Sequence, residues 1–493
     1  MMKKLGVCPA LGLPLCAGAM TAASAETLVQ LANLLGPKGF TSDSDAMAPW
    51  LVDWRGRYRG AAAAMLSPAT REEVAEAVRL CAAAGLAIVP QGGNTSMVGG
   101  ATPDGSGRAV ILSLRRMRAI RSLDREASRA VCEAGVILGE LHEAAAAAGR
   151  RFPLSLGAKG SATIGGLVST NAGGTQVLRF GTMRSLVEGI EAVLPDGSLF
   201  EGLAPLKKDN RGYNLTHLMV GAEGTLGVVT AASLRLVPGI GSRVVAWVGL
   251  GSAQDALRLL RHLEAAVGDG LESFELIPDS ALGLVLRHVP GTRAPLSQPF
   301  PWHALVEVVA PIGSPAPDKQ LLDALDAALA SGIARDGAIA GNEAQADVFW
   351  RLRDSISEAE KKDGPAAKHD ISVMVDVMPR FMGEAAAAVE ARFPGTRVNA
   401  FGHLGDGNVH FNVRAPEGAA AAWVEQEGRA VSAFVHDLVT AAGGSISAEH
   451  GIGQMKVGEL ARLGGAARLQ LLQGVKRGLD PLGIMNPGKL VPV

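Results

Sequence analysis

The chain has 493 residues, of which 48% are hydrophobic and 19% are charged, so it can bury a large core, and we expect two domains. Lys and Arg total 47 against 48 for Asp and Glu, and the net charge of -1 gives no bulk attraction to nucleic acid or to an anionic membrane. The partners should therefore be small molecules. The four cysteines form no CxxC motif, which argues against a disulfide framework or a cysteine metal site.

The N-terminus has two interpretations. Lys3 and Lys4, a following apolar run and small residues resemble the parts of a secretory signal. Pro9 and Pro14 interrupt that run, and a twin-arginine pair is absent. We favour a start at Met20, with residues 1–19 a leader or a misplaced start, and expect a cytoplasmic protein, with the periplasm as the alternative. No other segment approaches the ~20 apolar residues of a membrane span.

The first predicted elements lead into a glycine-rich loop. Thr70 and Glu73 have capping-box spacing, and the apolar pattern that follows predicts a helix that ends at Gly85. Residues 86–89 then predict a short buried strand. The loop at 90–96 comes next, and its glycines let backbone N–H groups approach an anion such as a pyrophosphate. A glycine-rich turn without a ligand is the alternative interpretation.

Similar loops recur at 153–157, 161–166, 169–174 and 221–229. None has the spacing of a Rossmann fingerprint or of a P-loop. Together they indicate an elongated ligand that is held by many loops.

The second half alternates strands and helices. Residues 244–250 and 303–309 predict strands, and residues 253–266 and 344–360 predict helices. Proline-rich stretches should be loops between them.

Arg353 and Ser357 lie four apart on the predicted 344–360 helix and should share one of its faces. Lys368 follows after a Gly-Pro break and should begin a strand that includes residues 371–375. A solvated, charged helix face is the alternative, because Glu358 and Glu360 crowd the same region.

Residues 399–413 predict a hairpin with a polar face. Val409, Phe411 and Val413 alternate with His410 and Asn412, so the two polar side chains should share the opposite face. The Gly-Asp-Gly turn at 405–407 folds the chain back and should bring His403 near His410. Two satisfied histidines at a hairpin are the alternative.

The pair Glu449-His450 lies in a second short segment flanked by glycine. Two imidazoles and a carboxylate, from His403, His410 and Glu449, suit a divalent metal such as zinc with an open position, while His450 would stay free as a base. An exposed polar turn is the alternative interpretation of the pair.

These motifs resemble a family in combination. The loop at 90–96, the 153–174 segment and the Glu223-Gly-Thr-Leu-Gly227 signature resemble the FAD-binding domain of the PCMH-type (vanillyl-alcohol-oxidase) flavoproteins. The segments at 399–413 and 447–453, with Asn486-Pro-Gly-Lys489, resemble the branch that contains D-2-hydroxyglutarate dehydrogenase, D-lactate dehydrogenase and the glycolate oxidase D subunit. The resemblance covers the chain from about residue 28 onward.

The resemblance implies an α+β fold: a PCMH-type FAD-binding domain of two α+β subdomains over residues 20–240, and a C-terminal α+β domain with an antiparallel sheet over 241–493. The last segment should return to the flavin. Family members that attach FAD covalently through the 90–96 loop carry a histidine where Asn94 stands, so the resemblance implies non-covalent FAD.

The resemblance also assigns roles to residues. His403, His410 and Glu449 match metal ligands (Zn²⁺, with Mn²⁺ as the alternative), and His450 matches the catalytic base. Substrate-binding positions match Arg353, Ser357, Lys368 and Asn412, with Ser357 standing where relatives carry threonine. The FAD-binding positions are Gln91, Gly92, Gly93, Asn94, Thr95, Ser96, Pro153, Ser155, Gly157, Ser161, Thr163, Gly165, Gly166, Ser169, Asn171, Gly173, Gly174, Glu223, Gly224, Gly227, Val228, Val229 and Asn486.

The expected activity is oxidation of a D-2-hydroxy acid by an FAD- and metal-dependent dehydrogenase, with D-2-hydroxyglutarate as the first candidate substrate. D-Lactate or glycolate oxidation is the alternative of the same class. A metallohydrolase and a non-catalytic flavin-binding subunit are the alternatives of other classes. Expected partners are a small 2-hydroxy acid and an electron acceptor such as an electron-transfer flavoprotein or a quinone, and a homodimer is considered.

Overall fold

The computed structural model describes residues 7–8, 13–14 and 22–492. The lysine pair and Met20 of the N-terminal segment lie outside the described residues. The chain divides into two compact units. Unit 1 comprises residues 1–172, 182–237 and 450–493, and unit 2 comprises residues 173–181 and 238–449. Residues 173–181, expected in the first domain, belong to unit 2, and residues 450–493, expected in the second domain, belong to unit 1.

Unit 1 contains a four-stranded sheet in the order β3-β4-β6-β5. Its strands are β3 (Phe40–Thr41), β4 (Ala64–Leu66), β5 (Ala87–Gln91) and β6 (Ala109–Ser113). Helix α3 (Arg71–Ala84) begins as predicted, because the Thr70 hydroxyl accepts from Glu73 N at 3.1 Å and the Glu73 carboxylate accepts from Ala69 N at 2.6 Å. Gly85 ends the helix with a φ of 62°.

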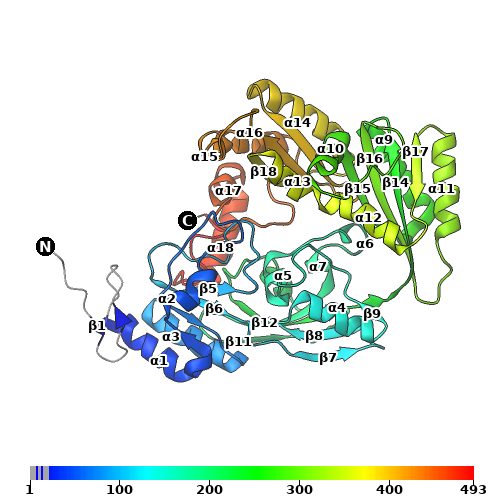
Figure 1. The fold of residues 1–493 in the computed structure, drawn as a ribbon. Helices are drawn as coiled ribbons and strands as arrows, with labels where there is room; N and C mark the ends of the chain where they lie inside the picture. Colours follow the sequence, from blue (N-terminus) through cyan, green and yellow to red (C-terminus); the bar gives the residue numbers. More distant parts are fainter. Residues whose placement is uncertain (1–6, 9–12, 15–21, 493) are drawn as a thin grey trace. The chain divides into compact units, whose positions relative to one another are not determined.

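A five-stranded antiparallel sheet, β11-β10-β12-β8-β7, is the second sheet of unit 1 (Figure 1). Val193 and Val228 from this sheet join the core formed by the first sheet and by helices α1 and α3. The strands are β7 (Ile120–Asp124), β8 (Arg129–Glu133), β10 (Val187–Val193), β11 (Leu199–Gly202) and β12 (Val228–Arg235). The helices of unit 1 include α1 (Ala22–Gly39), α4 (Leu138–Ala147), α5 (Ile164–Thr170), α7 (Met183–Leu186), α8 (Leu215–Met219), α17 (Val457–Leu463) and α18 (Ala466–Leu479).

Unit 2 is built on a seven-stranded sheet in the order β17-β14-β16-β15-β19-β20-β18. Its neighbouring strands pair antiparallel, which confirms the antiparallel sheet expected in the C-terminal half. The strands are β14 (Ile240–Leu250), β15 (Leu271–Pro278), β16 (Trp302–Pro311), β17 (Asp336–Ile339), β18 (Ala366–Ser372), β19 (Arg397–His403) and β20 (Asn408–Arg414).

Helices cover both faces of this sheet. One face packs against α9 (Ala253–Val267), α11 (Asp318–Ala330), α14 (Met378–Arg392) and α16 (Gly428–Ala441), and their apolar side chains form the main core of the unit. The other face packs against α10 (Asp279–His288), α12 (Glu343–Asp354) and α13 (Ile356–Asp363). A short helix, α6 (Val177–Phe180), contacts β15 of the same unit.

Two element predictions need correction. The single helix expected at 344–360 is divided at Ser355, which ends α12 and precedes α13. The strand expected to begin at Lys368 and to include residues 371–375 is β18, which runs from Ala366 to Ser372, so Lys368 lies inside it. Pairing with β20 sets this boundary, because Ser372 lies opposite the first residue of β20, Asn408. No helix of the described residues is long and apolar enough to cross a membrane.

Candidate functional site

Glycine-rich loops predicted to bind FAD converge in unit 1. A Cβ added to Gly93 would lie 1.8 Å from the Ser161 carbonyl oxygen, and one added to Gly92 would lie 2.2 Å from Thr163 Oγ1. The loop after β5 therefore rests directly on the segment that leads into α5. Only glycine permits this close approach of two backbones.

The loop at 221–227 and the C-terminal segment meet at the same place. The Glu223 carboxylate accepts from Ile452 N at 2.8 Å and from Gly453 N at 2.7 Å. Asn486 Nδ2 donates to the Glu223 carbonyl at 2.7 Å and to the Gly100 carbonyl at 3.0 Å. Burial raises the pKa of Glu223, although the two backbone donors oppose that shift.

Two observations fit a large polar cofactor at these loops. Buried oxygens of Gln91, Asn94, Thr163 and Asn486 have no hydrogen-bond partner within the protein, which is rare unless a ligand or water completes them. Asn94, Asn171, Glu223 and Asn486 also have positive φ angles, between 43° and 53°. Strained backbone of this kind concentrates at ligand-binding loops. The residues present therefore fit FAD.

The remaining predicted FAD positions lie in the same segments, with one exception. Gly173 and Gly174 belong to unit 2, where an added Cβ on Gly173 would lie 3.1 Å from Glu449 Oε1. The other positions stay in unit 1. Thr95 and Ser96 follow β5, and Pro153, Ser155 and Gly157 precede α5. Gly165, Gly166 and Ser169 lie in α5, Gly224 and Gly227 precede β12, and Val228 and Val229 begin it.

In unit 2, the hairpin β19-β20 places polar side chains on one face of the sheet. His403 lies opposite Asn408 at the turn, and the ring centroids of His403 and His410 are 5.5 Å apart, as the turn predicted. Val409, Phe411 and Val413 point into the main core, so His410 and Asn412 face the other way.

His403 is held by a buried glutamate from β15. Its Nδ1 lies 2.5 Å from Glu275 Oε1, and this contact leaves Nε2 as the nitrogen for a metal. Arg353 Nη2 lies 2.8 Å from Glu275 Oε2 and 3.2 Å from His403 Nε2. Arg353 therefore stands beside the nitrogen that would bind a metal, and a cation entering there must shift the guanidinium.

Burial and neighbouring charges shift the pKa values of Glu275, His403 and Glu449. Burial alone would raise the pKa of Glu275, but Arg353 and His403 lower it to about 2. Burial alone would lower the pKa of His403, but Glu275 raises it to about 9. Burial raises the pKa of Glu449 to about 7, and Asp370 and Asp406 add to the shift.

The predicted metal ligands are brought together only in part. Glu449 donates its backbone N–H to Asp370 Oδ2 at 2.9 Å, and the ligand atoms of these two carboxylates lie within 4.8 Å of each other. In the described part of the chain, this group of potential ligands does not include His403 or His410. His450 is the next residue after Glu449 and the first residue of the last segment of unit 1. The adjacent carboxylates of Asp370 and Glu449, with the pKa of Glu449 raised, and the imidazoles of His403 and His410 are donors of the kind that fits a divalent cation.

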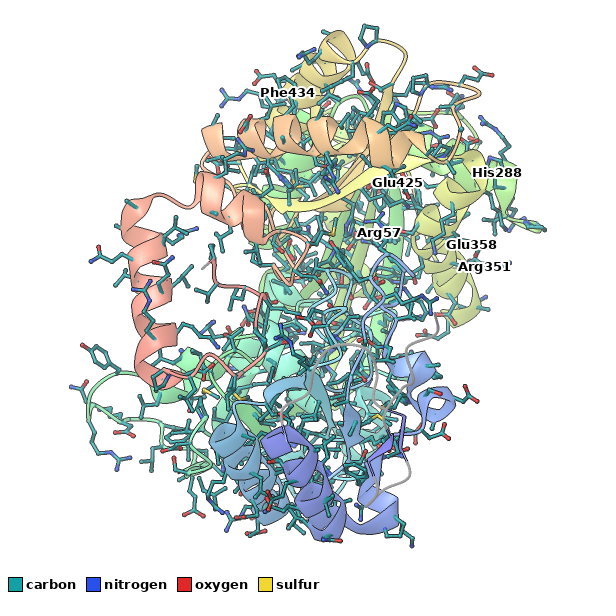
Figure 2. All side chains as sticks on the ribbon, turned by 90° about the vertical axis from the view of Figure 1, so that its left-hand side faces the viewer. Arg57, His288, Arg351, Glu358, Glu425 and Phe434 are labelled. Carbon is teal, nitrogen blue, oxygen red and sulfur yellow. The ribbon has the colours of Figure 1, made fainter. Side chains whose placement is uncertain are left out.

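The predicted substrate residues lie on two neighbouring elements. Lys368 lies opposite Asn412 in the β18-β20 pair, and both donate to the Glu360 carboxylate. Arg353, at the end of α12, is largely buried, whereas Ser357 on α13 is exposed. Figure 2 labels the exposed Arg351 and Glu358 on the outer surface of these two helices.

Sequence reasoning missed Glu275, Glu360 and Asp370. Glu275 was detectable in principle, because it is a charged residue inside the apolar run of β15. Glu360 gave the opposite signal: it stands in a charged run that suggested a solvated face, yet it is buried.

Comparisons with known proteins agree with this geometry. The family model "FAD binding domain" matches residues 62–202, and "FAD linked oxidases, C-terminal domain" matches residues 241–490. The mitochondrial D-2-hydroxyglutarate dehydrogenase of Arabidopsis thaliana is 36% identical, over 93% of this chain and 80% of its own length. The bovine enzyme of that name is 37% identical over 92% and 82%, and the enzyme of Xanthomonas citri pv. viticola is 36% identical over 89% and 91%.

The fold is shared with more distant solved structures. p-Cresol methylhydroxylase aligns with a TM-score of 0.71 at 14% identity, over 96% of this chain and 98% of its own, and alkyldihydroxyacetonephosphate synthase aligns with a TM-score of 0.71 at 17% identity, over 98% and 90%. These two likenesses show the PCMH-type fold alone. With two family models and these sequence relatives covering most of its length, the chain belongs to the FAD linked oxidases.

Proposed function

We propose that this protein oxidises a D-2-hydroxy acid to the 2-oxo acid, with D-2-hydroxyglutarate as the first candidate substrate. The observation that carries the proposal is the polar face of the unit 2 sheet, where two imidazoles, buried carboxylates and two cationic side chains share a single surface. The names of the sequence relatives support the choice of substrate.

FAD, when bound by the unit 1 loops without a covalent bond, supplies the acceptor for the hydride from the substrate C2. A divalent cation, zinc or manganese, would lower the pKa of the substrate hydroxyl. His403, His410 and Glu449 are the proposed ligands, with Glu275 orienting His403.

Each of the other predicted residues has a proposed task. His450 takes the hydroxyl proton as general base. Asn412 binds the C1 carboxylate through the N–H that Glu360 does not use. Arg353, Ser357 and Lys368 bind the distal end of the substrate, with Arg353 supplying the charge through the edge that Glu275 leaves free.

D-Lactate or glycolate remains the alternative substrate. The family assignment favours a flavin oxidoreductase over a metallohydrolase, and the imidazole and carboxylate groups of unit 2 argue against a non-catalytic flavin-binding subunit. An electron-transfer flavoprotein or a quinone is the proposed final electron acceptor, and a homodimer stays a prediction.

Flavin bleaching tests the proposal directly. The purified protein should be yellow, and anaerobic D-2-hydroxyglutarate should remove the absorbance near the flavin maximum, while the L-enantiomer should not. D-Lactate and glycolate should bleach it more slowly at equal concentration. A protein without flavin, or one that D-2-hydroxy acids leave oxidised, would refute the proposed activity, and faster bleaching by D-lactate would move the assignment to the alternative substrate.

A further inference from the structure

The buried carboxylate of Glu360 connects three polar side chains of the unit 2 sheet. Its Oε2 accepts from Lys368 Nζ at 3.0 Å and from Asn412 Nδ2 at 2.8 Å, and its Oε1 accepts from Asn399 Nδ2 at 2.7 Å. The Glu360 residue is only 1% exposed, whereas the Lys368 side chain is 19% exposed. Lys368 is therefore the partner through which a ligand can reach this network.

The network lies one row away from His410 and two rows away from His403 on the same sheet face. Asn399, Asn412 and Lys368 form one cross-strand row, and Phe401, His410 and Asp370 form the next. Rows two residues apart are separated by roughly 6.6 Å along a strand. A substrate whose reacting end lies at the histidines therefore extends its distal end toward Lys368 and Glu360.

Glu360 changes what Lys368 can bind. An ammonium paired at 3.0 Å with a carboxylate has its charge largely compensated, although it keeps N–H donors for a second acceptor. A substrate carboxylate on the same ammonium would stand beside the Glu360 carboxylate, and two like charges at that separation repel each other strongly where water is scarce. A neutral or hydroxylated substrate end meets no such repulsion.

We propose that Glu360 is a specificity-determining residue: it weakens the binding of a second substrate carboxylate at Lys368 and so broadens the site toward D-2-hydroxy acids with an uncharged distal end. This inference rests on the proposed function.

The test is steady-state kinetics of Glu360→Gln with D-2-hydroxyglutarate and D-lactate. Glutamine keeps the shape and an acceptor oxygen but removes the charge. Both substrates bring a C1 carboxylate to Asn412, which also contacts Glu360, but only D-2-hydroxyglutarate brings a second carboxylate to Lys368. Because about 1.4 kcal/mol of relieved repulsion corresponds to tenfold in affinity, KM for D-2-hydroxyglutarate should fall about tenfold more than KM for D-lactate. Inhibition by glutarate, which has two carboxylates and no hydroxyl to oxidise, should strengthen by a similar factor.

Matched variants identify the cause. Glu358→Gln alters an exposed carboxylate on the same helix, which pairs with Lys362 at 2.7 Å. This variant should change KM for neither D-2-hydroxyglutarate nor D-lactate. The double variant Glu360→Gln with Lys368→Met should not show the lower KM for D-2-hydroxyglutarate, because that decrease requires the Lys368 ammonium freed from Glu360. If Glu360→Gln lowers the melting temperature markedly, Glu360→Met is used instead, because methionine has a similar volume and no charge. The same decrease in KM for D-2-hydroxyglutarate is expected.

The outcomes separate this inference from the proposed function. A raised KM for D-2-hydroxyglutarate in Glu360→Gln would show that Glu360 positions Lys368 for a carboxylate, and an unchanged substrate ratio would show that it has no part in specificity. Either result overturns the inference while leaving the activity in place. A wild-type protein that no hydroxy acid reduces overturns the proposed function as well.

Discussion

Glu275 and Glu360 lie at less than 2% exposure, and each faces a cationic side chain. A buried carboxylate stays ionised only where partners compensate its lost hydration. Around Glu275 those partners are Arg353 and His403, and they hold its pKa near 2. The carboxylate therefore fixes two of the proposed functional side chains at once.

Glu275→Gln should weaken the binding of a divalent metal by roughly 10- to 100-fold, the usual effect of removing a carboxylate that orients a metal-binding histidine. It should also leave the Arg353 charge buried without its partner and lower stability. Competition titration of zinc against a chromophoric chelator measures the affinity, and circular dichroism measures the melting temperature.

Glu272→Gln is the matched control. Glu272 lies on the same strand, is fully buried and pairs with Arg179 at 2.9 Å, whereas Glu275 pairs with His403 and Arg353. It should lower stability and leave zinc affinity unchanged. Equal losses of zinc affinity in both variants would mean that Glu275 acts through general stability.

Metal affinity should rise with pH. Without metal, the pKa of His403 is raised to about 9 and that of Glu449 to about 7, so both sites carry protons at pH 6.5 that a metal must displace. Raising the pH through 7 and then toward 9 removes this competition. Zinc titrations at pH 6.5, 7.5 and 8.5 should therefore show increasing affinity, and a flat profile would remove these two groups from the ligand set.

At the scale of elements, the close contact of two FAD loops gives a sharp test. Gly93→Ala places a methyl group 1.8 Å from the Ser161 carbonyl oxygen, so one loop must move. The variant should lose most of its bound flavin during gel filtration. Gly160→Ala lies next to Ser161, but its methyl group meets no atom within 4 Å, so it should keep its flavin. Equal flavin content in the two variants would contradict the proposed role of this contact.

Elements with strong local signals could be predicted, whereas pairings between distant elements could not. The helix expected at 253–266 is α9, Ala253–Val267, because its apolar period and Ser252 cap lie within the segment itself. The hairpin brought His403 to His410 because its turn is also local. The end of β18, by contrast, depends on its pairing with β20, which no local pattern shows.

Contacts between residues that are distant in sequence could not be predicted in the site either. Glu275 lies 128 residues from His403, and Glu360 lies 52 residues from Asn412, so their contacts arise only in the folded chain. The split of the 344–360 helix at Ser355 likewise left Ser357 exposed, while the Arg353 side chain is only 12% exposed. The spacing of four residues alone could not show that difference.

For the whole molecule, we expect that the metal can be removed while the flavin stays bound. The proposed metal ligands His403, His410 and Glu449 lie in unit 2, whereas nearly all the proposed FAD contacts lie in unit 1. Dialysis against a chelator should therefore abolish turnover and leave the flavin spectrum in place, and added zinc or manganese should restore activity. Acid precipitation should then release the flavin, because no covalent bond holds it. Full activity at a measured metal content of zero would exclude a metal role.

The segment at 173–181 has a consequence for how this protein can be taken apart. The chain passes from one unit to the other after residues 172, 181, 237 and 449, so no single cut separates the two units. A gene fragment that stops at residue 237 would encode the small helix α6 without the strand β15 that it contacts, and would lack the Ile452 and Gly453 amides that bind Glu223. Expression of residues 1–237 or of residues 238–493 alone should yield an aggregating product. Two such fragments made together can reassemble only if the first supplies residues 173–181 to unit 2 and the second supplies residues 450–493 to unit 1.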